Sequence, residues 1–367
     1  MKVIKSIISR LPVTQKYRYQ VVFSIAFIWA LVDAIYLLIK VNTLDVADEF
    51  YFFEYKRPVT ILLREAVVFI FTAFMAFVLV FQFRKTTRYI PLWLNFLIKT
   101  GLLLFLAFLM NFAIHFSYSV FISHLSVNYA LNDFVHDAFK TQWILEKLPD
   151  QLIIFFFIQT FIEMMEKYSP GIFFDIFFGK YLQPREEVRI VMFIDLKDST
   201  PIAEKLGNKD YFRFIRDFIS LVSSALIENN GRIYQYVGDE IVVSWRYNPR
   251  NAKKCIDALI EARKLIQRRG ELFRRRYGVI PEFRVGIHIG EVTIGEIGII
   301  KKDLAMSGDT MNTTARIRSA CSELNQKFIV SKAVIDSLNL KDWQSESLGL
   351  VELKGKNNSI ELFALKI

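Results

Sequence analysis

Hydrophobic and polar positions divide the chain into two halves with different patterns. Up to about residue 180, apolar residues form long unbroken runs, whereas later they alternate or recur at helical spacing between polar residues. A membrane-spanning helix needs about 20 mostly apolar residues. The runs at 21–39, 67–83 and 101–120 qualify, and a shorter run at 152–165 does so only if it starts at or before Pro149. The pattern predicts an N-terminal α-helical transmembrane bundle of about four helices.

Lysine and arginine residues in the short connecting segments predict the orientation of this bundle. They are concentrated before the first run and between the second and third runs, while the segment around Asp48 is acidic. Because cytosolic loops are rich in lysine and arginine, both termini should be cytosolic, and the segments around Asp48 and at 123–142 should lie outside. The sequence predicts a multi-pass protein of the inner or plasma membrane, with ionisable Asp33 and His115 at membrane depth.

Domain boundaries follow from the same change of pattern. We predict a membrane domain at 1–165, a connector helix at 166–187 and a soluble cytosolic domain at 188–367. The connector carries phenylalanines on one helix face, at positions 173, 174, 177 and 178. Such a stripe is typical of a helix that lies on the membrane surface or of a dimer contact, and both interpretations stay open.

The soluble half places two carboxylates at the ends of predicted strands. A β-branched run at 188–193 ends in Ile194-Asp195, and a long helical pattern follows at 201–229. Two further strand-like runs, 232–236 and 240–245, flank Val237-Gly238-Asp239, where glycine permits a tight turn. This arrangement can bring Asp195 and Asp239 together. Two converging carboxylates suit Mg²⁺ or Mn²⁺, which bind one or two carboxylates together with substrate phosphates.

A second group of polar residues lies nearer the C-terminus. Segments 283–289 and 291–294 are predicted to form a strand pair around Gly290, and a helix then opens near Gly308. On this helix Asn312 and Arg316 share one face, where an amide and a guanidinium suit a ribose oxygen and a phosphoryl oxygen. The segment Lys354-Gly355-Lys356 adds positive charge. These residues alone indicate a metal-dependent enzyme that acts on phosphates, within an α/β sandwich.

Charge and cysteine content exclude other classes of protein. The net charge is +10, but the positive residues cluster beside the apolar runs, which favours a membrane surface over nucleic acid as the partner. No nucleic-acid partner is therefore predicted. The two cysteines, Cys255 and Cys321, give neither metal-ligand spacing nor a disulfide framework, and they suit a reducing cytosol.

The order of these fragments resembles the class III adenylyl and guanylyl cyclases. Segments 193–200 (FIDLKDST) and 236–240 (YVGDE) are similar to the two metal motifs of that family, and 308–316 (GDTMNTTAR) to its transition-state motif. The resemblance covers about 188–366 and implies a ferredoxin-like βαββαβ core. It also implies a head-to-tail homodimer with two composite sites. Each site would take metal carboxylates from one subunit and the asparagine and arginine from the other.

The resemblance further implies a role for each matching residue. Asp195 and Asp239 would hold two Mg²⁺ or Mn²⁺ ions per active site, and the Ile194 carbonyl could add a ligand. Asn312 would orient the ribose and Arg316 would meet the charge on the α-phosphoryl group. The triphosphate would contact lysine side chains, with Lys356 as the first choice and Lys354 as the second. The implied reaction is in-line attack of the ribose 3′-oxygen on the α-phosphorus, which expels pyrophosphate.

The departures from the family pattern concern selection of the base. Adenylyl members carry lysine where this chain has Gln235, and aspartate or threonine where it has Ala305. ATP is the predicted substrate of the nucleoside triphosphates, with GTP or a pyrimidine triphosphate as alternatives. A non-catalytic nucleotide-binding signalling domain and a transporter with a regulatory domain are further alternatives. A diguanylate cyclase is disfavoured, because no second glycine precedes Asp239.

Overall fold

The structure is a computed structural model in which two compact units are described. One unit consists of helices that end at Lys167, and the other is an α/β unit that begins with Ile172. The described residues are 12–43, 58–83, 90–140, 143–167, 172–300, 302–338, 344–355 and 359–367.

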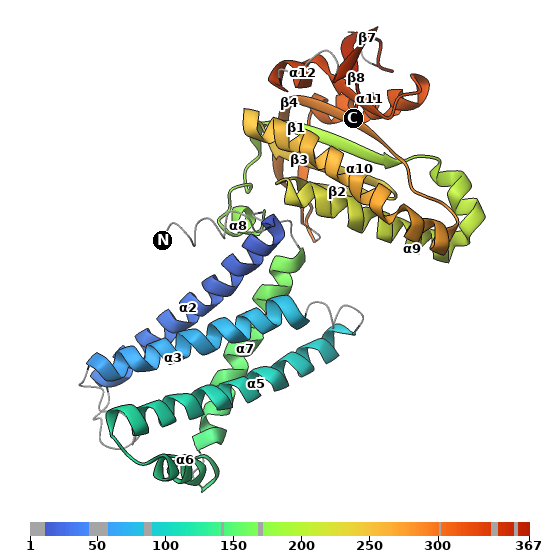
Figure 1. The fold of residues 1–367 in the computed structure, drawn as a ribbon. Helices are drawn as coiled ribbons and strands as arrows, with labels where there is room; N and C mark the ends of the chain where they lie inside the picture. Colours follow the sequence, from blue (N-terminus) through green and yellow to red (C-terminus); the bar gives the residue numbers. More distant parts are fainter. Residues whose placement is uncertain are drawn as a thin grey trace. The chain divides into compact units, whose positions relative to one another are not determined.

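Five α-helices build the described part of the N-terminal unit (Figure 1). They are α2 (Val13–Thr43), α3 (Pro58–Phe77), α5 (Leu92–Ser117), α6 (Val127–Lys140) and α7 (Trp143–Lys167). Two π-helical segments, η1 (Val78–Phe83) and η3 (Tyr118–Ile122), extend α3 and α5.

Three stretches of these helices are long and apolar enough to cross a membrane: Val13–Ile35, Ile61–Phe83 and Leu92–Ile122. The three long apolar helices predicted from the sequence are therefore confirmed. Helix α7 holds a shorter apolar stretch, Gln151–Met165, and contains Pro149. The number of membrane crossings stays a prediction.

Helix α5 begins at Leu92, well before the apolar run that starts at residue 101. The extra turns contain Lys99, which interrupts the apolar pattern but is buried in the structure. Its Nζ lies 2.9 Å from Oε1 of Glu163 on α7, and Asn95 Nδ2 donates to the same oxygen at 3.2 Å. This pairing explains how a charged residue is accommodated in a helix of this kind.

The other ionisable groups singled out in this unit also lie beside partners. Asp33 pairs with Arg64, whose Nη2 lies 3.0 Å from Oδ1. His115 is buried, with Nε2 3.7 Å from Asp133 Oδ2 on α6. Helix α6 itself occupies most of segment 123–142, which the sequence analysis treated only as a connecting segment.

An eight-stranded sheet forms the centre of the α/β unit, in the order β2-β3-β1-β4-β6-β8-β7, with β5 paired to β4. The strands are β1 (Arg185–Leu196), β2 (Arg232–Val237), β3 (Glu240–Arg246), β4 (Phe283–Ile297), β5 (Asp303–Ser307), β6 (Phe328–Ser331), β7 (Ser345–Val351) and β8 (Ile360–Leu365). Helix α9 (Ser199–Glu228) connects β1 to β2, and α10 (Pro249–Tyr277) connects β3 to β4. The order β2-β3-β1-β4 with these two crossovers confirms the predicted ferredoxin-like βαββαβ core.

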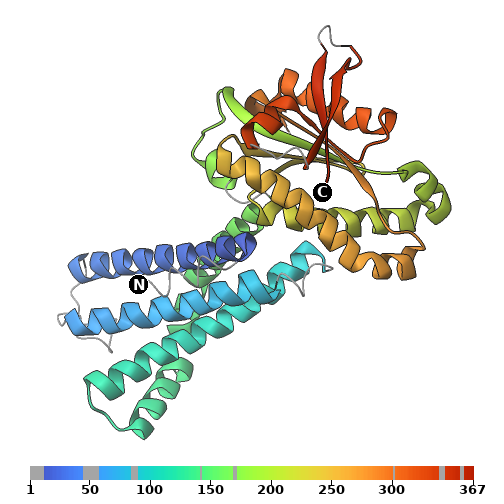
Figure 2. The ribbon, with the colours of Figure 1, turned by 45° about the horizontal axis from the view of Figure 1, so that its top comes forward.

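Alternation along β1 builds a core on each face of the sheet. Ile190, Met192 and Ile194 are buried in the larger core beneath α9 and α10, which lie side by side over one face (Figures 1 and 2). Val191 and Phe193 point to the other face, where they pack in a second cluster with residues of α11 (Asp309–Glu323). The period of two expected of a strand buried on both faces is thus observed.

The predicted strand pair around Gly290 is wrong. Strand β4 continues from Phe283 to Ile297, and Gly290 pairs with Arg189 of β1 within that ladder. A Cβ atom at Gly290 would lie 2.3 Å from Oγ1 of Thr310, so the glycine allows α11 to approach the strand and does not form a turn.

A short helix, α8 (Ile172–Phe177), begins the α/β unit and carries part of the phenylalanine stripe. Phe173 is buried, whereas Phe177 and Phe178 are exposed. Asp175 fixes α8 to the sheet, because its Oδ2 lies 2.8 Å from Nη1 of Arg232 on β2.

Candidate active site

The two metal-motif carboxylates come from neighbouring strands. Asp195 lies near the end of β1, and Asp239 lies in the turn between β2 and β3, where Gly238 adopts φ +62°. The register pairs Ile194 with Ile241, so the chain after Ile194 runs directly beside the β2–β3 turn. The structure therefore brings Asp195 and Asp239 to the same edge of the sheet, as the sequence analysis expected.

Their electrostatic environment also shows this proximity. Burial raises the pKa of Asp195, Arg318 and Arg284 lower it, and the negative charge of Asp239 raises it. The pKa of Glu240 is likewise raised by burial, with further increases from both aspartates and an opposing effect of Arg318. Three carboxyl groups partly removed from water form a region that favours a bound cation.

The donor set fits a hard divalent cation that is completed by phosphate ligands. Oδ2 of Asp239 is buried and has no hydrogen-bond partner within the described ranges. The same ranges contain no group of three or more His, Cys, Asp or Glu side chains placed to hold a metal ion by themselves. Mg²⁺ and Mn²⁺ are commonly held by one or two carboxylates and the substrate phosphates, which agrees with this arrangement.

Arg318 is the arginine that contacts these carboxylates, and the sequence analysis missed it. Its Nη2 lies 2.6 Å from Oε2 of Glu240, and its Nη1 lies 3.4 Å from Oδ2 of Asp195. Arg318 follows Thr310 and Thr314, both buried, at four-residue intervals along α11. The sequence feature that could have identified Arg318 is its position, because it continues the helix face that carries the two buried threonines.

Tyr211 of α9 is a second residue that the sequence analysis missed. Burial raises the pKa of its phenol, and the charges of Asp239 and Asp195 raise it further, which places Tyr211 beside both carboxylates. Ser199, at the start of α9, lowers this pKa. A half-buried tyrosine on an amphipathic helix has no sequence feature that separates it from an ordinary core residue.

The predicted transition-state residues occupy another face of α11. Asn312 is exposed and Arg316 is half-buried. Arg316 and Arg318 are two positions apart, so they project about 200° apart around the helix axis. Arg316 lies against the turn that contains Lys354 and Gly355, since a Cβ at Gly355 would be 3.4 Å from its Nη2. Lys356 lies outside the described residues.

The two candidate base-selecting residues lie on strands β2 and β5, which are connected by a hydrogen bond from a backbone group to a tyrosine side chain. The backbone N–H of Met306 on β5 donates to the hydroxyl oxygen of Tyr234 on β2 at 2.7 Å. Gln235 follows Tyr234 after a bulge in the β2–β3 ladder and is exposed. Ala305 precedes Met306 and is half-buried. The bond therefore connects the two strands next to both candidates.

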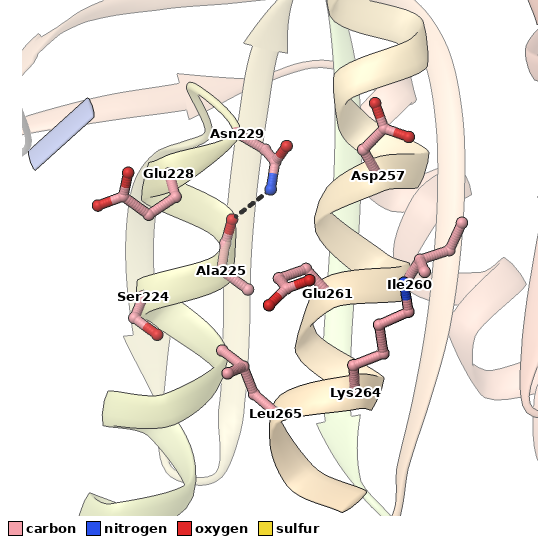
Figure 3. Close-up of a pocket in the computed structure, with 9 residues that line it drawn as sticks. All are labelled: Ser224, Ala225, Glu228, Asn229, Asp257, Ile260, Glu261, Lys264 and Leu265. Carbon is pink, nitrogen blue, oxygen red and sulfur yellow. Dashed lines mark hydrogen bonds between the residues drawn. The ribbon is translucent and has the colours of Figure 1, made fainter. Parts of the chain in front are cut away.

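A separate groove of about 580 Å³ lies between α9 and α10 (Figure 3). Its polar lining includes Glu228, Asp257, Glu261 and Lys264. None of the residues predicted to act in the site lines this groove. The carboxylate cluster at the end of β1, and not the groove, is therefore the candidate active site.

Comparison with known proteins agrees with the fold and with the motifs. The family profile described as the adenylate and guanylate cyclase catalytic domain matches residues 180–366, about half of the chain. This chain belongs to that family. The resemblance inferred from the three motifs is thereby confirmed.

Two adenylate cyclases are among the relatives of this chain. Adenylate cyclase 2 of Rhizobium meliloti (strain 1021) is 29% identical over 206 residues, which are 56% of this chain and 57% of that protein. The adenylate cyclase of Anabaena cylindrica is 25% identical over 185 residues, or 48% of this chain and 36% of that protein. The chain thus spans from about a third to somewhat over half of these relatives.

A solved structure supports the fold. A bacterial light-regulated adenylyl cyclase superposes with a TM-score of 0.53 at 17% identity, covering 60% of this chain and 65% of that one.

Proposed function

We propose that this protein is a membrane-anchored nucleotide cyclase that converts ATP into 3′,5′-cyclic AMP and pyrophosphate in a homodimer. One observation carries the proposal. On α11 of a single chain, Arg318 contacts Asp195 and the neighbouring Glu240, while Asn312 and Arg316 lie on another face of the helix. A complete site therefore needs Asn312 and Arg316 from a second copy, and a two-fold dimer would form two such sites.

Each residue has a role in this composite site. Asp195 and Asp239 would hold two Mg²⁺ or Mn²⁺ ions, with the Ile194 carbonyl as a further ligand. When bound, the metal ions lower the pKa of the ribose 3′-hydroxyl and neutralise the departing phosphates. Arg316 would donate to the α-phosphoryl oxygens, where negative charge grows in the transition state. Asn312 would hold the ribose so that the 3′-oxygen lies in line with the bond that breaks.

The triphosphate would be held from two sides. Lys354 lies on the turn beside Arg316, and Lys356 follows on the same segment. Helix α9 begins at Ser199, shortly after Asp195, and the free N–H groups at a helix N-terminus attract phosphate. In the reaction the 3′-oxygen–phosphorus bond forms and the bond from the α-phosphorus to the bridging oxygen breaks. The hydroxyl proton passes to solvent.

ATP is proposed as the substrate because the relatives quoted above are named adenylate cyclases. Gln235 can donate and accept hydrogen bonds, and Ala305 offers no side-chain hydrogen bond. GTP or a pyrimidine triphosphate therefore remains the alternative substrate. We also propose that the cyclase domain lies on the cytosolic side of the membrane, in agreement with the Lys and Arg distribution of the connecting segments.

Mixing two inactive variants tests the shared site. Asp195→Ala and Arg316→Ala should each be inactive in the full chain, assayed with Mn²⁺ and ATP. Co-expression with two different affinity tags allows the mixed dimer to be isolated, and one of its two sites then has neither defect. We expect about half of the wild-type turnover from this mixed dimer. No activity in purified mixed dimers would refute the composite site, and no cyclic product from wild type with any of the four ribonucleoside triphosphates would refute cyclase activity.

A further inference from the structure

Arg318 is held over the carboxylates by an unusually close approach of α11 to the sheet. At Gly286 of β4, a Cβ atom would lie 2.4 Å from the backbone nitrogen of Arg318 and 2.8 Å from the carbonyl oxygen of Thr314. Only glycine permits this approach, and the start of the Arg318 side chain is fixed as a result. The guanidinium then lies between Glu240 and Asp195, and its side chain is 28% exposed.

The contact with Glu240 is the closer of the two. Nη2 lies 2.6 Å from Oε2 of Glu240, whereas the Asp195 contact is 3.4 Å. Glu240 directly follows Asp239, and Arg318 bridges it to Asp195, so its carboxylate lies beside the two aspartates without being placed to bind the same cation. Its side chain is only 14% exposed.

We propose that Arg318 is a positioning residue that keeps Glu240 out of the metal-binding set, so that divalent cations bind this site strongly only together with the nucleotide. This inference rests on the proposed function and names a further residue that tunes the same site. Without Arg318, the Glu240 side chain would be free to turn toward a cation held by Asp195 and Asp239, and three carboxylates on one cation are the chemistry of a site that holds metal without substrate. With Arg318, two carboxylates remain, and the phosphates must supply the other ligands.

Charge supports the same conclusion. Arginine stays protonated at all physiological pH values, so its charge opposes a nearby divalent cation permanently. At an effective dielectric constant of about 20, a unit charge within about 6 Å of a divalent ion changes its affinity by well over tenfold. The triphosphate brings its own negative charge and offsets this repulsion when it binds. Arg318 thereby favours the metal–nucleotide complex over free metal.

Binding of Mn²⁺ without nucleotide tests this role directly. The full-length protein is reconstituted, stripped of metal and titrated with Mn²⁺, and the EPR signal of free Mn²⁺ reports how much is bound. Arg318→Met should bind Mn²⁺ at least about tenfold more tightly than wild type. Arg318→Lys keeps the charge and should remain close to wild type. The double variant Arg318→Met/Glu240→Gln lacks the third carboxylate and should lose most of the gain.

Matched variants separate this role from a general effect of lost charge or lost packing. Arg274→Met removes an arginine from an exposed pair with Glu271 on α10, and it should leave Mn²⁺ affinity unchanged. Arg318→Gln repeats the test with a polar side chain if Arg318→Met melts at a lower temperature than wild type. Unchanged Mn²⁺ affinity in folded Arg318→Met or Arg318→Gln would overturn the inference. Equal tightness of the single and double variants would also overturn it, because Glu240 would then not be the donor.

These outcomes differ from those of the proposed function. A wild-type protein that produces cyclic nucleotide, with Mn²⁺ affinity insensitive to Arg318, would leave the cyclase assignment intact and remove only this inference. Tighter Mn²⁺ binding in Arg318→Met, from a protein that turns over no triphosphate, would support the role of Arg318 and remove the cyclase assignment.

Discussion

Substitution of Gly286 by alanine perturbs the point at which α11 meets the sheet. Gly286 lies in β4 opposite Phe193 of β1, and the helix backbone passes directly above it. The added methyl group would meet three backbone atoms within 3.0 Å: the nitrogen and Cα of Arg318 and the carbonyl oxygen of Thr314. A side chain could rotate away from such a contact, but a helix backbone can respond only by moving as a whole.

The size of the effect follows from this geometry. Overpacking a tight interior typically costs 1–3 kcal/mol, and contact with backbone on three atoms places Gly286→Ala near the upper end, at about 3 kcal/mol. For a domain of this size, each kcal/mol corresponds to about 2–4 °C in the unfolding midpoint, so Tm should fall by about 6–12 °C. Movement of α11 would also shift Asn312, Arg316 and Arg318, and turnover should fall by at least about tenfold.

Gly270 of α10 provides the matched control. A Cβ there would meet only the side chain of Ile280, at 3.5 Å, which is ordinary van der Waals contact. Because glycine is unfavourable inside a helix, Gly270→Ala should stabilise by about 0.5–1 kcal/mol. Thermal unfolding of the full-length variants, followed by the fluorescence of buried Trp245 among other tryptophans, compares the two. If Gly286→Ala also left Tm unchanged or raised it, as Gly270→Ala should, the close approach of α11 to β4 would be refuted.

Three further predictions concern metal, base and topology. Asp239→Ala should abolish turnover with Mg²⁺ and Mn²⁺ while Tm without metal is unchanged or higher, because the buried Oδ2 has no hydrogen bond to lose; near wild-type activity would exclude Asp239 as a ligand. Gln235→Lys should raise the ratio of kcat/KM for ATP over GTP, CTP and UTP, and unchanged ratios would show that position 235 does not face the base. Cysteine labelling from outside should modify Asp48→Cys but not Thr86→Cys, two positions outside the described residues, and the reverse result would overturn the orientation. The native thiols should give little background, since Cys255 and Cys321 are buried and burial raises the pKa of Cys321 to about 12.

Features of the fold that depend on local pattern were predictable from the sequence. The strand that ends near Asp195, the turn at Gly238 and the long helix after Asp195 each follow from neighbouring residues, and they predicted an α/β sandwich. The βαββαβ core was implied by the family resemblance, and the strand order confirms it. The Gly290 turn was wrong because two different requirements select glycine. A turn needs a backbone conformation that glycine adopts easily, whereas Gly290 needs space for Thr310, which is remote in sequence.

The membrane helices illustrate the same limit. The predicted apolar run began after Lys99, because a charged residue interrupts the apolar pattern. The partner that allows Lys99 to stay inside the helix, Glu163, lies far along the chain on α7, so the sequence did not reveal the pair. A charged residue in an apolar helix can mark a helix end or one member of a buried pair, and single-sequence periodicity cannot distinguish the two. The three-dimensional contact decides, since a paired lysine can stay within the helix at a much lower cost than an isolated one.

Helix α11 shows why only part of the candidate site was found from sequence. Spacing of four residues detects groups on one face, and it correctly joined Asn312 with Arg316. The same spacing places Arg318 on the face of Thr310 and Thr314. Those threonines do not match a catalytic motif and they are buried, so their face is typical of a helix side packed against the core. One helix therefore presents an arginine to its own carboxylates and, in the proposed dimer, another to its partner's. A substitution at either arginine would lower turnover, so activity alone cannot separate their roles. Metal affinity without nucleotide can, because Arg318 contacts Asp195 and Glu240 of its own chain.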